Sequence, residues 1–110
     1  MKKLTSICTG LLLVSAAVFA EDHSVAALEQ ANAAVVYGEA GHTSHLLEHA
    51  KTALDHLLAA SITAKGVSKK YLEDAVTELQ EAIDHGDMGH VGAATKHAKA
   101  AVRDIKAGNK

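Results

Sequence analysis

Residues 43–64 read TSHLLEHAKTALDHLLAASITA, and this stretch decides the fold. Its apolar or small positions recur at alternating steps of three and four, at Leu47, Ala50, Leu54, Leu57 and Ser61. That spacing puts them in one stripe along a helix and is typical of a helix in a bundle. The stretch therefore predicts a long amphipathic helix with one buried face.

Four histidines follow the same helix, at His42, His45, His49 and His56. At roughly 100° per residue they lie about 80–140° to one side of the apolar stripe, on the flank of the helix. Imidazole is the commonest transition-metal ligand in proteins, and His45 and His49 are one turn apart. A solvated polar face is the plain alternative for any single histidine, but the clustering favours metal binding.

Glycines divide the rest of the chain into three more helical segments, and no stretch is typical of a strand. We expect helices over about 24–37, capped by Ser24 and ended by Gly38, over 68–86, capped by Ser68 and ended by Gly86, and over 91–107. Their expected buried positions are Leu28, Ala31 and Val35 in the first, Leu72, Val76, Leu79 and Ile83 in the next, and Ala94, Ala98, Val102 and Ile105 in the last.

The chain repeats itself at an offset of 48 residues. Gly41-His42 followed by His49-Ala50-Lys51 recurs as Gly89-His90 followed by His97-Ala98-Lys99. The repeated unit is one helical hairpin, present twice. Two hairpins with short loops predict an all-α, up-down-up-down four-helix bundle.

This topology brings both hairpin tips to one end of the bundle, and with them most of the histidines. We expect a primary metal site there and secondary ligands about 10 Å further down the helices. The primary candidates are His42, His45, His85 and His90, completed by Glu39 or Asp87, and the secondary candidates are His49 and His97. His23 and His56 are the expected pure surface residues.

The first twenty residues are typical of a secretory signal peptide. Lys2 and Lys3 precede an apolar run, and Val18-Phe19-Ala20 offers small residues for cleavage after Ala20. The run is too short to span a membrane. We therefore expect a single-domain mature chain, residues 21–110, in the periplasm and without a membrane segment.

The composition of that mature chain narrows its chemistry. Cys8, the single cysteine, would leave with the signal peptide, which excludes disulfides and thiolate metal sites. Thirteen acidic residues remain against nine basic ones, a net charge of −4, which argues against nucleic acid as a partner. Imidazole with carboxylate suits Cu(II), Ni(II) and Zn(II), and Cu(II) is bound most tightly by such a set. We expect a monomer, with a metal-bridged dimer as the alternative.

The chain resembles the small metal-binding protein family over nearly the whole mature sequence. The matching runs are Gly41-His42-Thr43, Leu46-Leu47-Glu48-His49-Ala50-Lys51, His85-Gly86, Gly89-His90-Val91-Gly92 and Ala94-Thr95-Lys96-His97-Ala98. The resemblance implies a periplasmic four-helix bundle that buffers or sequesters copper, and other divalent metals less well. This chain has far fewer histidines than is typical of the family, and Tyr37 stands where the match to His85 leads one to expect another. We therefore expect fewer bound ions, held mainly at the loop end.

Three other functions fit the sequence less well. An enzyme is disfavoured because the chain offers no nucleophile and a thin bundle offers no concave apolar pocket. A haem-binding bundle is disfavoured because an alanine-rich core leaves little room for the porphyrin. A chaperone-like interaction module would use Lys65, Lys69 and Lys70 against the acidic residues that follow them, although such charge segregation is usually a solvated helix face.

Overall fold

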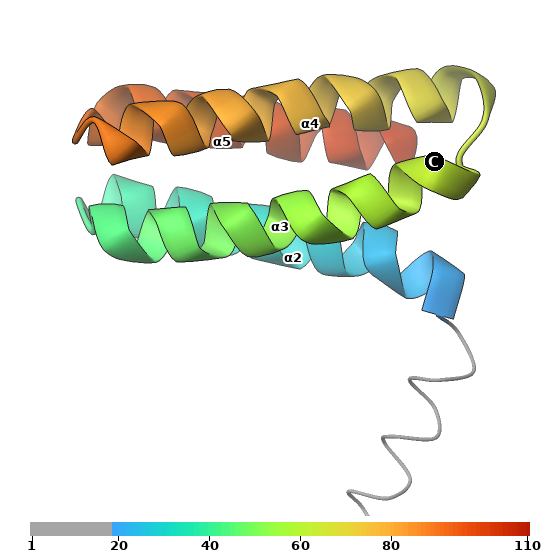
Figure 1. Ribbon diagram of the computed structural model, residues 1–110, viewed down its shortest axis with the longest axis horizontal. Coiled ribbons are helices and arrows are strands. Elements are labelled where there is room, and N and C mark those ends of the chain that lie inside the picture. Colours follow the sequence, from blue (N-terminus) through green and yellow to red (C-terminus); the bar gives the residue numbers. More distant parts are fainter. Residues whose placement is uncertain (1–18) are drawn as a thin grey trace, which may run out of the picture.

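The computed structural model describes residues 19–110, with side chains from His23 onward. Its helices are α2 (Phe19–Glu39), α3 (Thr43–Thr63), α4 (Gly66–Asp87) and α5 (Val91–Gly108). The packed neighbours are α2 with α3, α4 with α5, α3 with α4, and α2 with α5. The two hairpins lie side by side with both tips at the same end (Figure 1). The predicted all-α, up-down-up-down bundle is confirmed.

Both hairpin tips use the same turn. In the first, the His42 amide donates to the carbonyl of Tyr37 (2.9 Å) and the Gly41 amide donates to the carbonyl of Gly38 (3.0 Å). The second turn repeats this pattern, from His90 to His85 (2.8 Å) and from Gly89 to Gly86 (2.9 Å). Gly41 and Gly89 adopt φ of 81° and 79°, which a residue with a Cβ rarely does. These paired bonds form the Schellman arrangement that ends helices, so the repeat extends to the backbone.

The expected helix ends at Gly38 and Gly86 are wrong, because α2 and α4 each continue for one more residue. Both glycines are buried. A Cβ on Gly38 would lie 2.6 Å from Leu46 Cδ1, and one on Gly86 would lie 2.7 Å from Leu47 Cδ2. These two glycines therefore allow close helix packing beside the tip, and the turn itself falls three residues later.

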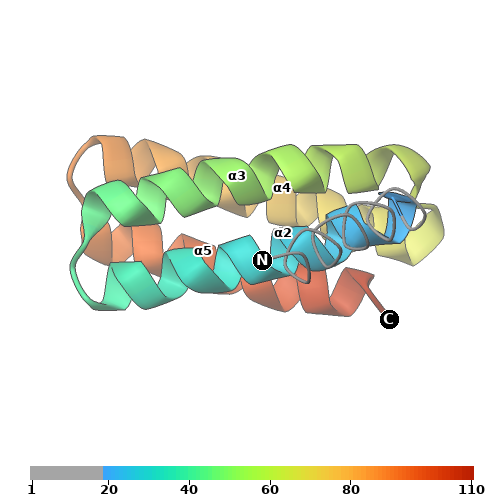
Figure 2. The same cartoon turned by 90° about the horizontal axis from the view of Figure 1, so that it is seen from below.

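The expected N-caps, Ser24 and Ser68, are also wrong, since both serines lie inside their helices. The Ser24 hydroxyl donates to Asn109 Oδ1, and the Ser68 hydroxyl donates to the carbonyl of Gly108 at 2.5 Å. Both serines therefore tie α2 and α4 to the end of α5, far from the hairpin tips. Figure 2, a view from below, shows the C-terminus at this end of the bundle.

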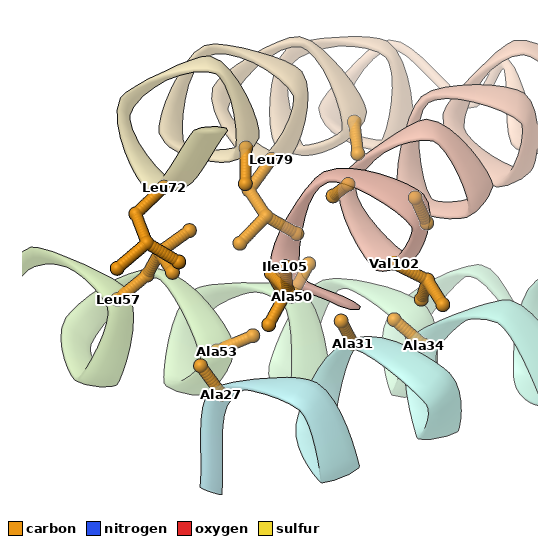
Figure 3. Close-up of a cluster of buried hydrophobic side chains, with 14 of the residues drawn as sticks. Ala27, Ala31, Ala34, Ala50, Ala53, Leu57, Leu72, Leu79, Val102 and Ile105 are labelled. Carbon is orange, nitrogen blue, oxygen red and sulfur yellow. The ribbon is translucent and has the colours of Figure 1, made fainter. Parts of the chain in front are cut away.

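Alanine dominates the core (Figure 3), and on α3 the buried face differs from the one expected. On α3 the buried residues are Leu46, Ala50, Ala53, Leu57 and Ala60. The expected Leu47, Leu54 and Ser61 are half-buried. The stripe is thus rotated by about 40–60° towards the histidines, at 100° per residue. The prediction had favoured bulky side chains, whereas closely packed helices place alanines at the contact.

The other helices follow the same rule. All four expected core residues of α5 are buried. On α2 the buried residues are Ala27, Ala31 and Ala34, and on α4 they are Leu72, Ala75, Leu79 and Ala82. The expected Leu28, Val35, Val76 and Ile83 pack against the edge of the core, half-buried. Within residues 19–110, no helix is both long and apolar enough to cross a membrane.

Candidate metal site

Three potential ligands converge on the second hairpin. Glu81 and His85 are one turn apart on α4, and His97 faces them from α5. One donor atom from each lies within 4.8 Å of the others. The imidazoles of His85 and His97 stack, with their ring centroids 5.2 Å apart and their planes 9° apart. This cluster is named here the α4–α5 donor group.

Hydrogen bonding in the α4–α5 donor group suits metal ligation. His97 Nδ1 lies 2.8 Å from Glu78 Oε1, so the carboxylate fixes the ring and leaves Nε2 as the donor towards a cation. His85 Nε2 is 3.9 Å from Glu81 Oε2, and His85 Nδ1 is buried without a hydrogen-bond partner. An orphaned buried nitrogen costs free energy unless it is paired, and a cation held by this cluster would give the imidazole a partner.

His90 adds a third imidazole next to this group. Its ring centroid is 5.9 Å from that of His85, and its side chain is exposed at the tip. His90 is therefore close enough to join the coordination of an ion at the α4–α5 donor group by a change of rotamer.

A row of carboxylates continues the negative field along the same hairpin. Burial, together with the neighbouring carboxylates of Asp74 and Glu78, raises the pKa of Asp104, and Arg103 and Lys70 oppose the shift. Such mutual repulsion marks a surface where carboxylates crowd together. A cation on this face would relieve it.

The first hairpin keeps the geometry of the second but loses its donors. Tyr37 stacks on His49 with centroids 5.2 Å apart and planes 4° apart, as His85 stacks on His97. His49 Nδ1 pairs with Gln30 Oε1 at 2.7 Å, where its counterpart pairs with a glutamate. Ala33 takes the place of Glu81 in the repeat. A phenol, an amide and a methyl group thus stand where the second hairpin has an imidazole and two carboxylates.

The Tyr37 ring also lies beside His45, with centroids 4.8 Å apart. Thus Tyr37 contacts both members of the expected His45–His49 chelating pair. His42 and His45 remain neighbours, with centroids 6.1 Å apart, and His45 Nδ1 lies 3.7 Å from Glu48 Oε1. Both histidines are exposed at the tip.

The two tips do not share one site in the structure. Among the side chains of residues 23–110, the ligand atoms that converge are those of the α4–α5 donor group, and no such group joins His42 or His45 to His85 or His90. The packing explains this separation. Because α2 packs on α5 and α3 packs on α4, the outer faces of the α2–α3 and α4–α5 hairpins lie on opposite sides of the bundle (Figure 1). The predicted grouping of four histidines at one site is therefore not formed.

The two loop carboxylates differ in their surroundings. Glu39 Oε2 forms an ion pair with Lys99 Nζ across α2 and α5, at 2.8 Å. Asp87 is exposed at the end of α4 and is not part of the α4–α5 donor group. Neither carboxylate belongs to the α4–α5 donor group, and their predicted role as metal ligands stays a prediction.

Sequence reasoning missed two features. Glu81 precedes His85 by four residues, a spacing that places two ligands on one helical turn and could have revealed the site. His23 and His56 were expected to be surface residues, yet both are half-buried and their Nδ1 atoms are 3.0 Å apart. The pairing of helices α2 and α3 brings them together, and no motif in the sequence signals it.

Comparison with known proteins agrees with this chemistry. A family model described as small metal-binding protein matches residues 1–108. No curated protein matches the chain.

Proposed function

Because the chain belongs to the small metal-binding protein family, we propose that it buffers or sequesters a divalent transition metal, most tightly Cu(II), in the periplasm. The α4–α5 donor group carries this proposal. Two imidazoles and a carboxylate form a set of borderline and hard donors that suits Cu(II), Ni(II) and Zn(II), and the Irving–Williams order places Cu(II) first among them.

A role in binding, as the family implies, fits the exposure of the donors. The side chains of His85 and His97 are 29% and 33% exposed, and that of Glu81 is 50% exposed. An ion held there stays open to water and to competing ligands. Such a site suits exchange with a surrounding metal pool better than permanent retention of one ion.

The proposed periplasmic location rests on the predicted signal peptide, residues 1–20, of which residues 1–18 lie outside the described residues. The mature chain would contain no thiol, so its donors would not be lost to oxidation in a disulfide-forming compartment. Imidazole and carboxylate ligands are not altered by the oxidising conditions of such a compartment.

The alternative of an interaction module gains no support from the lysines that suggested it. Lys69 pairs with Glu73 at 3.5 Å and Lys70 pairs with Asp74 at 3.4 Å, each one turn along α4. These contacts are the ordinary i, i+4 pairs of a solvated helix. Both ion pairs therefore lie within α4.

Calorimetric titration with Cu(II) tests the proposal. The His85→Ala/His97→Ala variant should lose the tightest binding phase, whereas His49→Ala should keep it. His49 is the matched control, because it holds the position of His97 in the other hairpin and also bonds to a side chain of the preceding helix. Circular dichroism would confirm that both variants fold. An unchanged tight phase in the double variant would refute the site.

Proton competition gives an independent check. Imidazole must lose its proton to bind a cation, so Cu(II) affinity should be much weaker at about pH 5 than at about pH 8. Equal affinity across that range would exclude histidine ligation.

A further inference from the structure

The end of the bundle away from the hairpin tips holds a second histidine pair. His23 on α2 and His56 on α3 have ring centroids 5.2 Å apart and planes 40° apart. Their Nδ1 atoms are separated by 3.0 Å. Without a metal, one of these nitrogens must carry the proton that lies between them, and the other must accept it.

This separation matches two cis ligands of one metal ion. Imidazole nitrogens bind such ions at about 2.0–2.1 Å, so two nitrogens 3.0 Å apart subtend roughly 95° at the ion. Near-right angles are those of tetragonal Cu(II) and square-planar Ni(II). The pair thus already has the spacing that such an ion requires, and the proton between the two nitrogens moves to Nε2 of the ring that carried it.

Processing would bring further nitrogens to the same place. Cleavage after Ala20 makes His23 the third residue of the mature chain, after Glu21 and Asp22. A free α-amine, the next two amide nitrogens and the Nδ1 of a third-position histidine can bind Cu(II) or Ni(II) in one plane, closing two five-membered chelate rings and one six-membered ring. The ion displaces two amide protons and, where the amine is protonated, one more.

The helix does not hold those amides once the signal peptide is gone. In an α-helix each amide donates to the carbonyl four residues earlier. For Asp22 and His23 the positions four residues earlier fall before Ala20, in the part of the chain that cleavage would remove. Both amides are then among the unpaired donors at the start of the helix, so a metal that takes them competes with no helical acceptor for these two nitrogens.

We propose that the mature N-terminus, His23 and His56 form a second metal site, with His23 in the plane of the ion and His56 as an axial ligand from α3 when the ion is Cu(II). The proposal rests on the proposed metal-binding function and on cleavage after Ala20. It is confined to the first hairpin, because Tyr71 and Asp104 occupy the equivalent positions in the second. Each hairpin then carries one site, at opposite ends of the bundle.

The test uses the mature chain, residues 21–110, carrying His85→Ala/His97→Ala so that the α4–α5 donor group is removed. One equivalent of Ni(II), which in the planar form takes no axial ligand, should give a diamagnetic complex with sharp NMR signals. The ring signals of His23, as a ligand, and of His56, as its direct neighbour, should both shift. A matched chain with one extra residue ahead of Glu21 keeps every side chain but moves His23 out of third place. This extended chain should not form the planar complex, so the Ni(II) bound in the planar form should fall from one equivalent to none.

Three outcomes would overturn the proposal: a paramagnetic complex with the mature chain, planar binding that survives the extra residue, or a secreted protein whose mass shows a start other than Glu21. His56→Ala should retain the planar complex but release it from α3, and an unmoved His56 ring in the unmutated protein would remove that residue from the site. Failure here with Cu(II) still bound at His85 and His97 leaves the proposed function standing. Failure at both ends removes both proposals.

Discussion

The double variant Ala33→Glu/Tyr37→His should give the first hairpin a copy of the α4–α5 donor group. Tyr37 and His49 already stack at the same 5.2 Å centroid distance as His85 and His97, and their planes are just as close to parallel. The backbone turn is shared as well. An imidazole at position 37 and a carboxylate at position 33 therefore need no rearrangement of α2 or α3 to face His49.

The size of the effect follows from mass action. When the free metal concentration is 100 times the dissociation constant of a site, binding adds about 2.7 kcal/mol to the free energy of unfolding. In a domain of this size, 1 kcal/mol corresponds to about 4–8 °C in Tm. The double variant should therefore bind one more Cu(II) than the unmutated chain, and saturation of the added site should raise Tm by a further 11–22 °C or so.

Calorimetric titration and thermal melts with and without Cu(II) measure both quantities. Ala33→Glu/Tyr37→Phe is the matched control, since it retains an aromatic ring on His49 and the new carboxylate but supplies no second imidazole. If the double variant and this control bound the same number of ions, the repeat geometry would not be what determines metal binding.

Two further predictions concern stability. Gly38→Ala should be less stable than Gly92→Ala by about 1–3 kcal/mol in urea unfolding, because the new Cβ at Gly38 meets Leu46 whereas the one at Gly92 meets open space; equal stabilities would contradict the close packing described beside the tip. Asp104→Asn should stabilise the protein at neutral pH. Burial and nearby carboxylates raise the pKa of Asp104 in the folded state, so the fold binds this proton more tightly than the unfolded chain does, and stability falls as pH rises from about 3.9 through the raised value. The gain from asparagine should vanish below that window, and a gain that persisted there would have another cause.

The repeat made most of the fold predictable. A hairpin that recurs at an offset of 48 residues fixes four helices, short turns at one end and antiparallel neighbours, as observed. Helix ends were less predictable, because Gly38 could mark either a turn or a close contact. The buried face of α3 was misjudged for a related reason. Alanine contributes little to a hydrophobic periodicity, yet it lies where the helices approach one another most closely.

The site was predictable in composition but not in grouping. The stacked pair of His85 and His97 joins residues that the sequence had singled out. Their separation from His42 and His45 depends on which helices of the two hairpins pack together, and periodicity alone does not determine that pairing. The contact between His23 and His56 depends on the same information, since a separation of 33 residues carries no sequence signal.

The α2–α3 and α4–α5 hairpins present their histidines on opposite sides of the bundle, and this affects how metal ions could link several molecules. An ion that cross-links exposed imidazoles of two copies occupies one side of each and leaves the other side available. Such cross-linking has no geometric reason to stop at pairs, so about one ion per protein chain would favour open-ended strings of molecules, whereas an excess of metal would fill each side separately and break the strings.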